Sequence, residues 1–208
     1  MASAAARARA FLSGAAKAKP VSYVEKRVLR TSPMHLLNII SDVDSYSQFL
    51  PQCTHSRILR RSSCGTMFDA TLTVGLPPLL SEKYVSRVKV DTNAMTVEAR
   101  SIRSSLFDSL KSRWKLRPVS ASEERRNELS RGRNALSNVT SSNLNSAEAD
   151  EDKAEQEVCD VEFEVEIKAS NPLIVGTLDK VLEEVAGKQV AAFERRCAQI
   201  PQSKDAKR

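Results

Sequence analysis

Residues 172–197, PLIVGTLDKVLEEVAGKQVAAFERRC, are the longest part of the chain with a helical pattern of apolar residues. Ser170 or Asn171 can cap a helix here, and Pro172 suits its first turn because a missing N–H costs nothing there. Charged residues fall mostly between the apolar positions, so we predict a long amphipathic helix whose apolar stripe is covered by the rest of the fold. The apolar positions are Leu178, Val181, Leu182, Val185, Ala186, Val190, Phe193 and Cys197.

The sequence before this helix is typical of β-strands joined by short turns. Residues 159–168 alternate strictly between apolar and charged side chains, and residues 66–74 alternate between apolar and polar ones, so each strand has one buried and one solvated face. Short links at 63–65 and 91–93 favour hairpins and therefore an antiparallel meander. The predicted strands are Val21–Arg30, Cys53–Arg61, Thr66–Val74, Glu82–Asp91, Ala94–Ser101, Leu106–Arg117 and Cys159–Lys168.

A short helix is predicted after the first strand, with Ser32 as its cap and Pro33 as its first residue. The following segment, 42–51, is too broken for one helix and too apolar for an open loop, so we expect it to pack as a lid or wall. A curved antiparallel sheet wrapped around a long C-terminal helix is the helix-grip arrangement of the α+β class.

The chain of 208 residues is long enough for one domain, 21–200, with appendages. Its net charge of +6 includes four cations that precede Glu25, the first acidic residue, so the remaining chain carries only +2. We therefore expect no nucleic-acid partner, and no apolar run is long enough for a membrane span.

Three segments are excluded from the predicted fold. Residues 1–20 are rich in Ala and Arg and lack acids, which is typical of a mitochondrial transit peptide; a disordered tail is the alternative. Residues 119–156 have no apolar period and read as a disordered insertion, although a short helix near 123–129 is compatible with the sequence. Residues 201–208 form a polar tail.

Motifs for catalysis or metal binding are not evident in the sequence. There is no glycine-rich phosphate loop and no nucleophile elbow, so we expect no catalytic residue and no enzyme activity. Cys53, His55 and Cys64 could in principle collect a metal, but they lack the close ligand pairs of zinc sites. Reduced, buried or half-buried cysteines and no metal are the expectation.

Several short motifs lie along the chain in a fixed order and spacing. They are Asp42, Val43, Tyr46, Phe49, Leu50, Pro51, Cys53 and Ser56; Leu72, Val74 and Gly75; Glu82, Tyr84, Ser86 and Val88; Leu106, Phe107, Leu110 and Trp114; and Ala192 to Arg196. In this order and spacing they resemble the mitochondrial coenzyme Q-binding protein family of the START-like, polyketide cyclase-related superfamily. The resemblance runs from about Val21 to Cys197 and departs at Gln52, where that family commonly has tryptophan.

The resemblance implies a hydrophobic tunnel between sheet and helix that binds ubiquinone or its late precursors as a ligand, with no other cofactor. It also implies a peripheral location on the matrix side of the mitochondrial inner membrane, with respiratory-chain or quinone-synthesis proteins as partners. Two alternatives are a cyclase or aromatase of the same fold and a scaffold for quinone-synthesis enzymes. The expected ligand-binding residues, which could also simply fill the core, are Tyr46, Phe49, Pro51, Phe68, Leu72, Val74, Glu82, Tyr84, Phe107, Trp114, Val161, Phe163, Val185 and Phe193.

The link at 75–80 is apolar where a strand connection is normally polar. Leu76, Leu79 and Leu80 surround a Pro-Pro pair, so they are candidates for reversible contact with a membrane. The alternative is that these leucines cover one end of the core.

Overall fold

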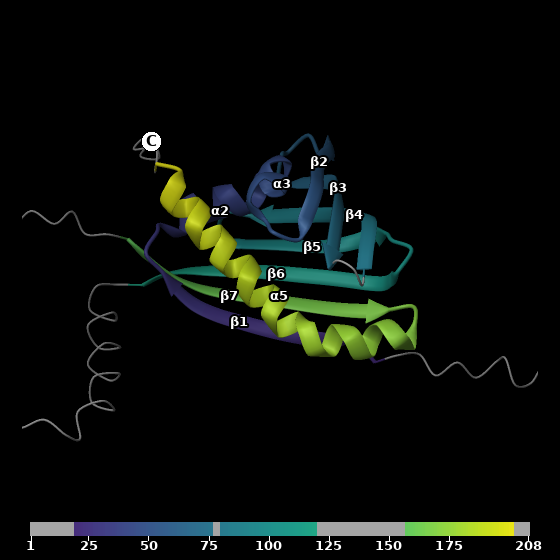
Figure 1. Cartoon of the computed structure of the whole chain (residues 1–208). Coiled ribbons are helices and arrows are strands. Elements are labelled where there is room, and N and C mark those ends of the chain that lie inside the picture. The colour runs from purple at the N-terminus through teal and green to yellow at the C-terminus, as the bar shows by residue number, and fades with distance from the viewer. Residues whose placement is uncertain (1–18, 77–79, 120–156, 202–208) are drawn as a thin grey trace, which may run out of the picture.

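The computed structural model describes residues 19–76, 80–119 and 157–201, which form one seven-stranded antiparallel sheet and its covering helices (Figure 1). The sheet order is β1-β7-β6-β5-β4-β3-β2, so the first strand along the chain pairs with the last. The predicted strand ends agree with the structure to within two residues. The strands are β1 (Val21–Leu29), β2 (Cys53–Arg61), β3 (Met67–Leu76), β4 (Leu80–Asp91), β5 (Thr96–Arg103), β6 (Phe107–Val119) and β7 (Val158–Ala169).

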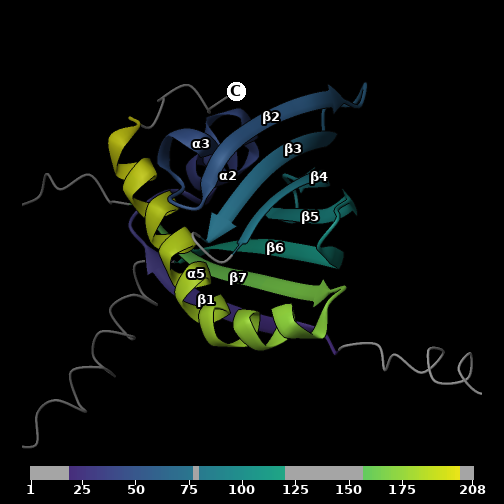
Figure 2. The same cartoon turned by 45° about the vertical axis from the view of Figure 1, so that its right-hand side comes forward.

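The long helix α5 (Pro172–Gln199) lies on the concave side of this sheet (Figure 2). It packs across β1 and β7 and meets the short helix α2 (Pro33–Ser41). Leu182, Ala186, Val190 and Phe193 are buried on the helix face that meets the sheet, as their spacing predicts. The helix-grip fold predicted from the sequence is therefore confirmed.

The start of α2 follows from its sequence. The Ser32 side chain accepts a hydrogen bond from the His35 backbone N–H at 3.1 Å, and Pro33 occupies the first turn. The 3₁₀-helix η1 (Val43–Ser45) and helix α3 (Tyr46–Phe49) follow and pack against β2, where Ile58 N–H donates to Asp44 at 2.6 Å. The expected wall at 42–51 is thus present, with Tyr46 and Leu50 buried.

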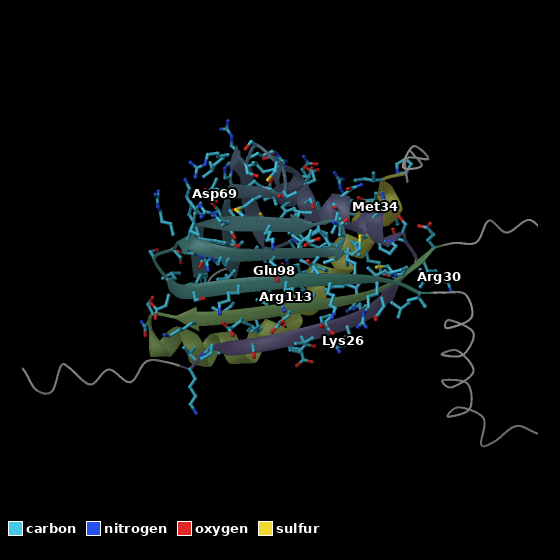
Figure 3. All side chains as sticks on the ribbon, turned by 180° about the vertical axis from the view of Figure 1, so that it is seen from behind. Lys26, Arg30, Met34, Asp69, Glu98 and Arg113 are labelled. Carbon is cyan, nitrogen blue, oxygen red and sulfur yellow. The ribbon has the colours of Figure 1, made fainter. Side chains whose placement is uncertain are left out.

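The convex face of the sheet carries many polar side chains (Figure 3), and several of them form ion pairs. Asp69 accepts hydrogen bonds from Arg87 at 2.8 Å and from Arg60 at 3.1 Å, and Arg113 donates to Glu98 at 2.9 Å. The hydrogen bonds from Arg87 hold the pKa of Asp69 below its ordinary value. Polar side chains on this face are therefore matched to one another and to solvent.

Several predictions fall on residues outside those described: nearly all of the transit peptide and insertion, Leu79 and the end of the polar tail. Leu76 and Leu80 pair with each other at the ends of β3 and β4, but their side chains are not described. No helix in the described part of the chain is both long and apolar enough to cross a bilayer.

The four cysteines are free in the structure, and the described residues contain no cluster suited to a metal ion. Cys53 and Cys159 are buried and Cys197 is half-buried, but Cys64 is exposed, which corrects the expectation that all four are at least partly covered. The reason is its place in the β2–β3 turn, where Gly65 adopts a left-handed φ of 73° to reverse the chain.

Candidate functional site

A cavity of about 180 Å³ lies between the concave face of the sheet and α5. Strands β3 to β7 form its floor, α5 its roof, and residues of α2, η1 and the β2 start one wall. For comparison, a cavity of about 150 Å³ can hold benzene, while pockets for drug-sized ligands span about 300 to 1,000 Å³. The cavity therefore has room for a substituted ring but not for a long chain.

Small side chains at the centre of the floor explain why the interior is hollow here. Ala99 of β5 pairs with Val88 of β4 on one side and with Ser112 of β6 on the other, and Ser86 lies two residues before Val88. Protein interiors are otherwise close-packed, so a row of small residues leaves a void that its neighbours cannot fill.

Aromatic rings close the cavity on one side of this floor. Trp114 stacks on Phe163 with ring centroids 4.3 Å apart, and Tyr84 lies on the inward face of β4. Phe193 of α5 packs edge-to-face against Trp114, Tyr46 and Phe49 at 4.9 to 5.3 Å. These contacts fix the ring orientations and anchor α5 to the sheet.

The structure brings eight of the predicted site residues to the cavity wall. The other six lie elsewhere: Pro51 is exposed, Phe49 is partly buried behind the wall, and the remaining four are buried. The eight that line the cavity are Tyr46, Leu72, Val74, Tyr84, Phe107, Trp114, Phe163 and Val185. The four buried ones are Phe68, Glu82, Val161 and Phe193.

Glu82 has a role that the sequence did not indicate. Its side chain is neither on the solvated face nor part of the cavity wall. It accepts hydrogen bonds from the β5–β6 turn: Ser104 Oγ donates at 2.7 Å, Ser105 N–H at 2.7 Å and Leu106 N–H at 3.2 Å. Ser105 Oγ also donates to the carboxylate at 2.9 Å. Burial by itself would raise the pKa of Glu82, but these hydrogen bonds outweigh it and hold the pKa below its ordinary value. Glu82 is therefore a structural carboxylate.

The cavity is lined by few polar groups, and only some of these groups have a hydrogen-bond partner within the protein. Tyr46 donates its hydroxyl to the Ile40 carbonyl, so that hydroxyl proton is already engaged. The Tyr84 hydroxyl makes no hydrogen bond to a described residue, and burial raises its pKa, so it stays protonated. Ser86 Oγ is buried and has no hydrogen-bond partner among the described residues. Tyr84 and Ser86 thus offer unused donors inside the cavity.

Sequence reasoning missed Ser86, Ser112 and the helix residue Gln189 as cavity-lining residues. A signal for Ser86 was present, because Glu82, Tyr84, Ser86 and Val88 follow a period of two and all four are buried. A serine is too often solvated for this spacing alone to place it inside.

Among the described residues, those that line the cavity include no Asp, Glu, His, Lys or Arg. Cys53 is present there, but burial raises the pKa of its thiol, so it is not an activated nucleophile. The cavity as described is suited to holding an apolar ring rather than to moving protons.

Residues 29–194 match the model of the family "Polyketide cyclase / dehydrase and lipid transport". The chain belongs to this family. A START superfamily protein from Mycobacterium smegmatis has the same fold, with a TM-score of 0.63 at 14% identity, covering 86% of this chain and 99% of that one.

The curated relatives include coenzyme Q-binding proteins and bacterial toxins. The chain is 35% identical over 114 residues to the coenzyme Q-binding protein COQ10 homolog B, mitochondrial, of Xenopus laevis. This match covers 53% of this chain and 45% of the relative. It is 31% identical over 107 residues to the ribosome association toxin RatA of Rickettsia prowazekii, covering 50% of this chain and 70% of that protein. The resemblance to coenzyme Q-binding proteins expected from the sequence is confirmed, although the chain spans only about half the length of that Xenopus relative.

Proposed function

We propose that this protein binds a prenylated quinone, ubiquinone or one of its late precursors, with the quinone ring inside the cavity. The observation that carries the proposal is the cavity itself: an apolar, ring-sized space under α5 with the unpaired Ser86 hydroxyl and the Tyr84 side chain on its wall. The similarity to coenzyme Q-binding proteins supports the choice of a quinone among the possible rings.

The chemistry of the wall suits a quinone. A quinone ring is flat and largely apolar, so it can pack against aromatic faces such as those of Trp114 and Phe163. Its carbonyl oxygens are acceptors only, and the hydroxyls of Tyr84 and Ser86 can donate to them. The cavity volume accommodates the ring and leaves the isoprenoid tail to extend out of it.

Binding rather than catalysis is the better reading of this site. A cyclase or aromatase needs acid–base groups that converge on its substrate, and the described lining consists of aliphatic, aromatic and uncharged polar residues, Gln52 and Gln189 among them. A scaffold role would not require a cavity with unsatisfied donors.

The proposal includes delivery of the quinone at the matrix side of the mitochondrial inner membrane, in support of respiratory electron transport and quinone synthesis. The coenzyme Q-binding relatives carry "mitochondrial" in their names, which supports this location.

The β3–β4 connection is the proposed membrane contact through Leu76, Leu79 and Leu80, and it directly follows the cavity-lining Gly75. Respiratory-chain or quinone-synthesis proteins are the proposed protein partners.

Trp114 provides a direct test because it is the single tryptophan of the chain and lines the cavity. A ubiquinone with a ten-carbon tail, titrated into the ligand-free protein, should quench Trp114 fluorescence saturably, since a quinone in ring contact accepts an electron from the excited indole. Decanol serves as the tail-only control and should leave the emission unquenched. No saturable quenching by the quinone would contradict the proposal and leave the similarity to ribosome association toxins as the better guide to function.

A further inference from the structure

Ser86 is the most unusual polar residue in the described core. The residue is 3% exposed, lies on β4 between the inward-facing Tyr84 and Val88, and lines the cavity. Its Oγ has no hydrogen-bond partner among the described residues. Buried polar atoms are nearly always paired in native proteins, so an unpaired one needs an explanation.

Other buried polar side chains in this part of the fold are satisfied within the protein. Glu82, four residues earlier on the same strand, accepts four hydrogen bonds. Ser56 of β2 accepts from Ser47 N–H at 3.0 Å and donates to the Asp44 carbonyl at 3.3 Å. Thr31 Oγ1 lacks a hydrogen bond of ordinary geometry, but Thr31 lies before α2, beside the Cys197 thiol, and does not line the cavity. Ser86 is therefore distinctive in combining an unpaired hydroxyl with open space in front of it.

Burying this hydroxyl costs stability that an alanine would not cost. The same strand shows that the fold can satisfy a buried polar group when it uses one for structure. A hydroxyl that has no structural use and faces a ring-sized cavity is placed to be satisfied by whatever enters.

We propose that the Ser86 hydroxyl donates a hydrogen bond to a ring oxygen of the bound quinone and so makes the cavity select for the ring rather than for the tail. This inference rests on the proposed function. The cavity of about 180 Å³ encloses little more than a ring, so discrimination among prenylated lipids depends on the oxygens at its wall. A serine hydroxyl can also accept a hydrogen bond, so it suits the quinol form as well.

The test compares the wild-type protein with Ser86→Ala and Ser86→Thr. The dissociation constant is measured for a ubiquinone with a ten-carbon tail. The dissociation constant of decanol is measured by the competition of decanol with a fluorescent fatty acid. Ser86→Ala should bind the quinone about two- to tenfold more weakly, the loss expected for one hydrogen bond, and decanol unchanged. Ser86→Thr keeps the hydroxyl and should keep the affinity for the quinone.

Two further readouts separate recognition from a structural role. The melting temperature of ligand-free Ser86→Ala should equal or exceed that of wild type, because the change removes an unsatisfied buried group. The infrared carbonyl stretch of bound quinone should move to higher frequency in Ser86→Ala, as expected when a hydrogen bond to the carbonyl is lost.

The outcomes distinguish this inference from the proposed function. If wild type and Ser86→Ala bind the quinone equally well, with identical carbonyl frequencies, the role of Ser86 is overturned while quinone binding stands. A lower melting temperature of ligand-free Ser86→Ala, with unchanged quinone affinity, would likewise assign Ser86 to the fold. If wild type itself fails to bind the quinone, the proposed function fails and this inference with it.

Discussion

The concave and convex faces of the same sheet handle polar groups in opposite ways. On the convex face, charged side chains such as Glu98 and Arg113 are paired with one another at the solvent boundary (Figure 3). On the concave face, Glu82 is satisfied by hydrogen bonds inside the protein, whereas the Ser86 hydroxyl is unpaired and lines the cavity. An unpaired polar atom on the convex face can bind water, so it indicates nothing about function. On the concave face burial makes such an atom costly, so it points to a ligand that pairs with it.

The largest expected effect comes from breaking the packing of the concave face. Phe193→Ala should lower the free energy of unfolding by about 3 to 5 kcal/mol, because Phe193 is fully buried among three aromatic rings. Urea denaturation measures the change. Ile102→Ala on the opposite face, where the side chain is 44% exposed, is the control and should cost no more than about 0.5 kcal/mol. Similar losses for both variants would mean that the two faces are not distinguished by packing.

Removing the buried carboxylate is expected to have the next largest effect. Glu82→Gln should cost about 2 to 3 kcal/mol of unfolding free energy, because an amide group places a donor where four donors already converge. Glu98→Gln breaks an exposed ion pair with Arg113 on the convex face and should cost at most about 1 kcal/mol. An equal cost for the two would refute the structural role assigned to Glu82.

The stability difference between wild type and Glu82→Gln should depend on pH in a predictable direction. Because the pKa of Glu82 is depressed in the folded state, its contribution is complete above the ordinary glutamate value of 4.5 and is lost as the pH falls through the lowered pKa. The stability difference between wild type and Glu82→Gln should therefore be constant from pH 7 to about pH 5 and shrink at lower pH. A difference that grows on acidification would contradict this assignment.

Filling the cavity should have a smaller effect on stability and a large one on binding. Ala99→Leu places a bulky side chain on the cavity floor and should stabilise the ligand-free protein by about 0.5 to 2 kcal/mol while abolishing quinone-dependent quenching of Trp114. Arg100→Leu changes the next residue, which is exposed on the convex side, and should leave quenching intact. Undiminished quenching in Ala99→Leu would place the quinone elsewhere.

The smallest perturbation is chemical labelling of the cysteines. Hydrogen bonds from Ser62 and Thr66 lower the pKa of the exposed Cys64 thiol to about 7, whereas burial raises the pKa of Cys197 to about 11 and that of Cys159 to about 12. Iodoacetamide at pH 7.5 should therefore modify Cys64 first, as peptide mass spectrometry can show. Cys53 lines the cavity and should be labelled slowly, and more slowly still with quinone bound. Fast labelling of Cys53 regardless of ligand would argue that the cavity is open to water.

The sequence predicted the elements of this fold well because their patterns are local. The alternation in β7 and the apolar stripe of α5 each follow from one stretch of chain, and both are confirmed. The pairing of β1 with β7 could not be read in the same way, because the two strands are separated by most of the chain. Strand order depends on how the whole sheet closes around the helix.

The site was predicted less completely, and for a physical reason. Large residues such as Trp114 and Phe163 were found because aromatic side chains favour the interior in any fold. The cavity exists because of small residues, Ser86, Ala99 and Ser112, whose inward orientation is set by register with neighbouring strands. Glu82 was misjudged for the same reason, since its hydrogen-bond donors come from the β5–β6 turn.

Native mass spectrometry of the full chain, purified gently from a host that makes ubiquinone, tests directly whether the cavity holds a quinone. We expect one prenylated quinone per wild-type chain, released on collisional activation and identified by its mass, and none in Ala99→Leu isolated in parallel. A wild-type protein that arrives empty, remains empty after incubation with ubiquinone and still melts cooperatively would contradict quinone binding in the cavity.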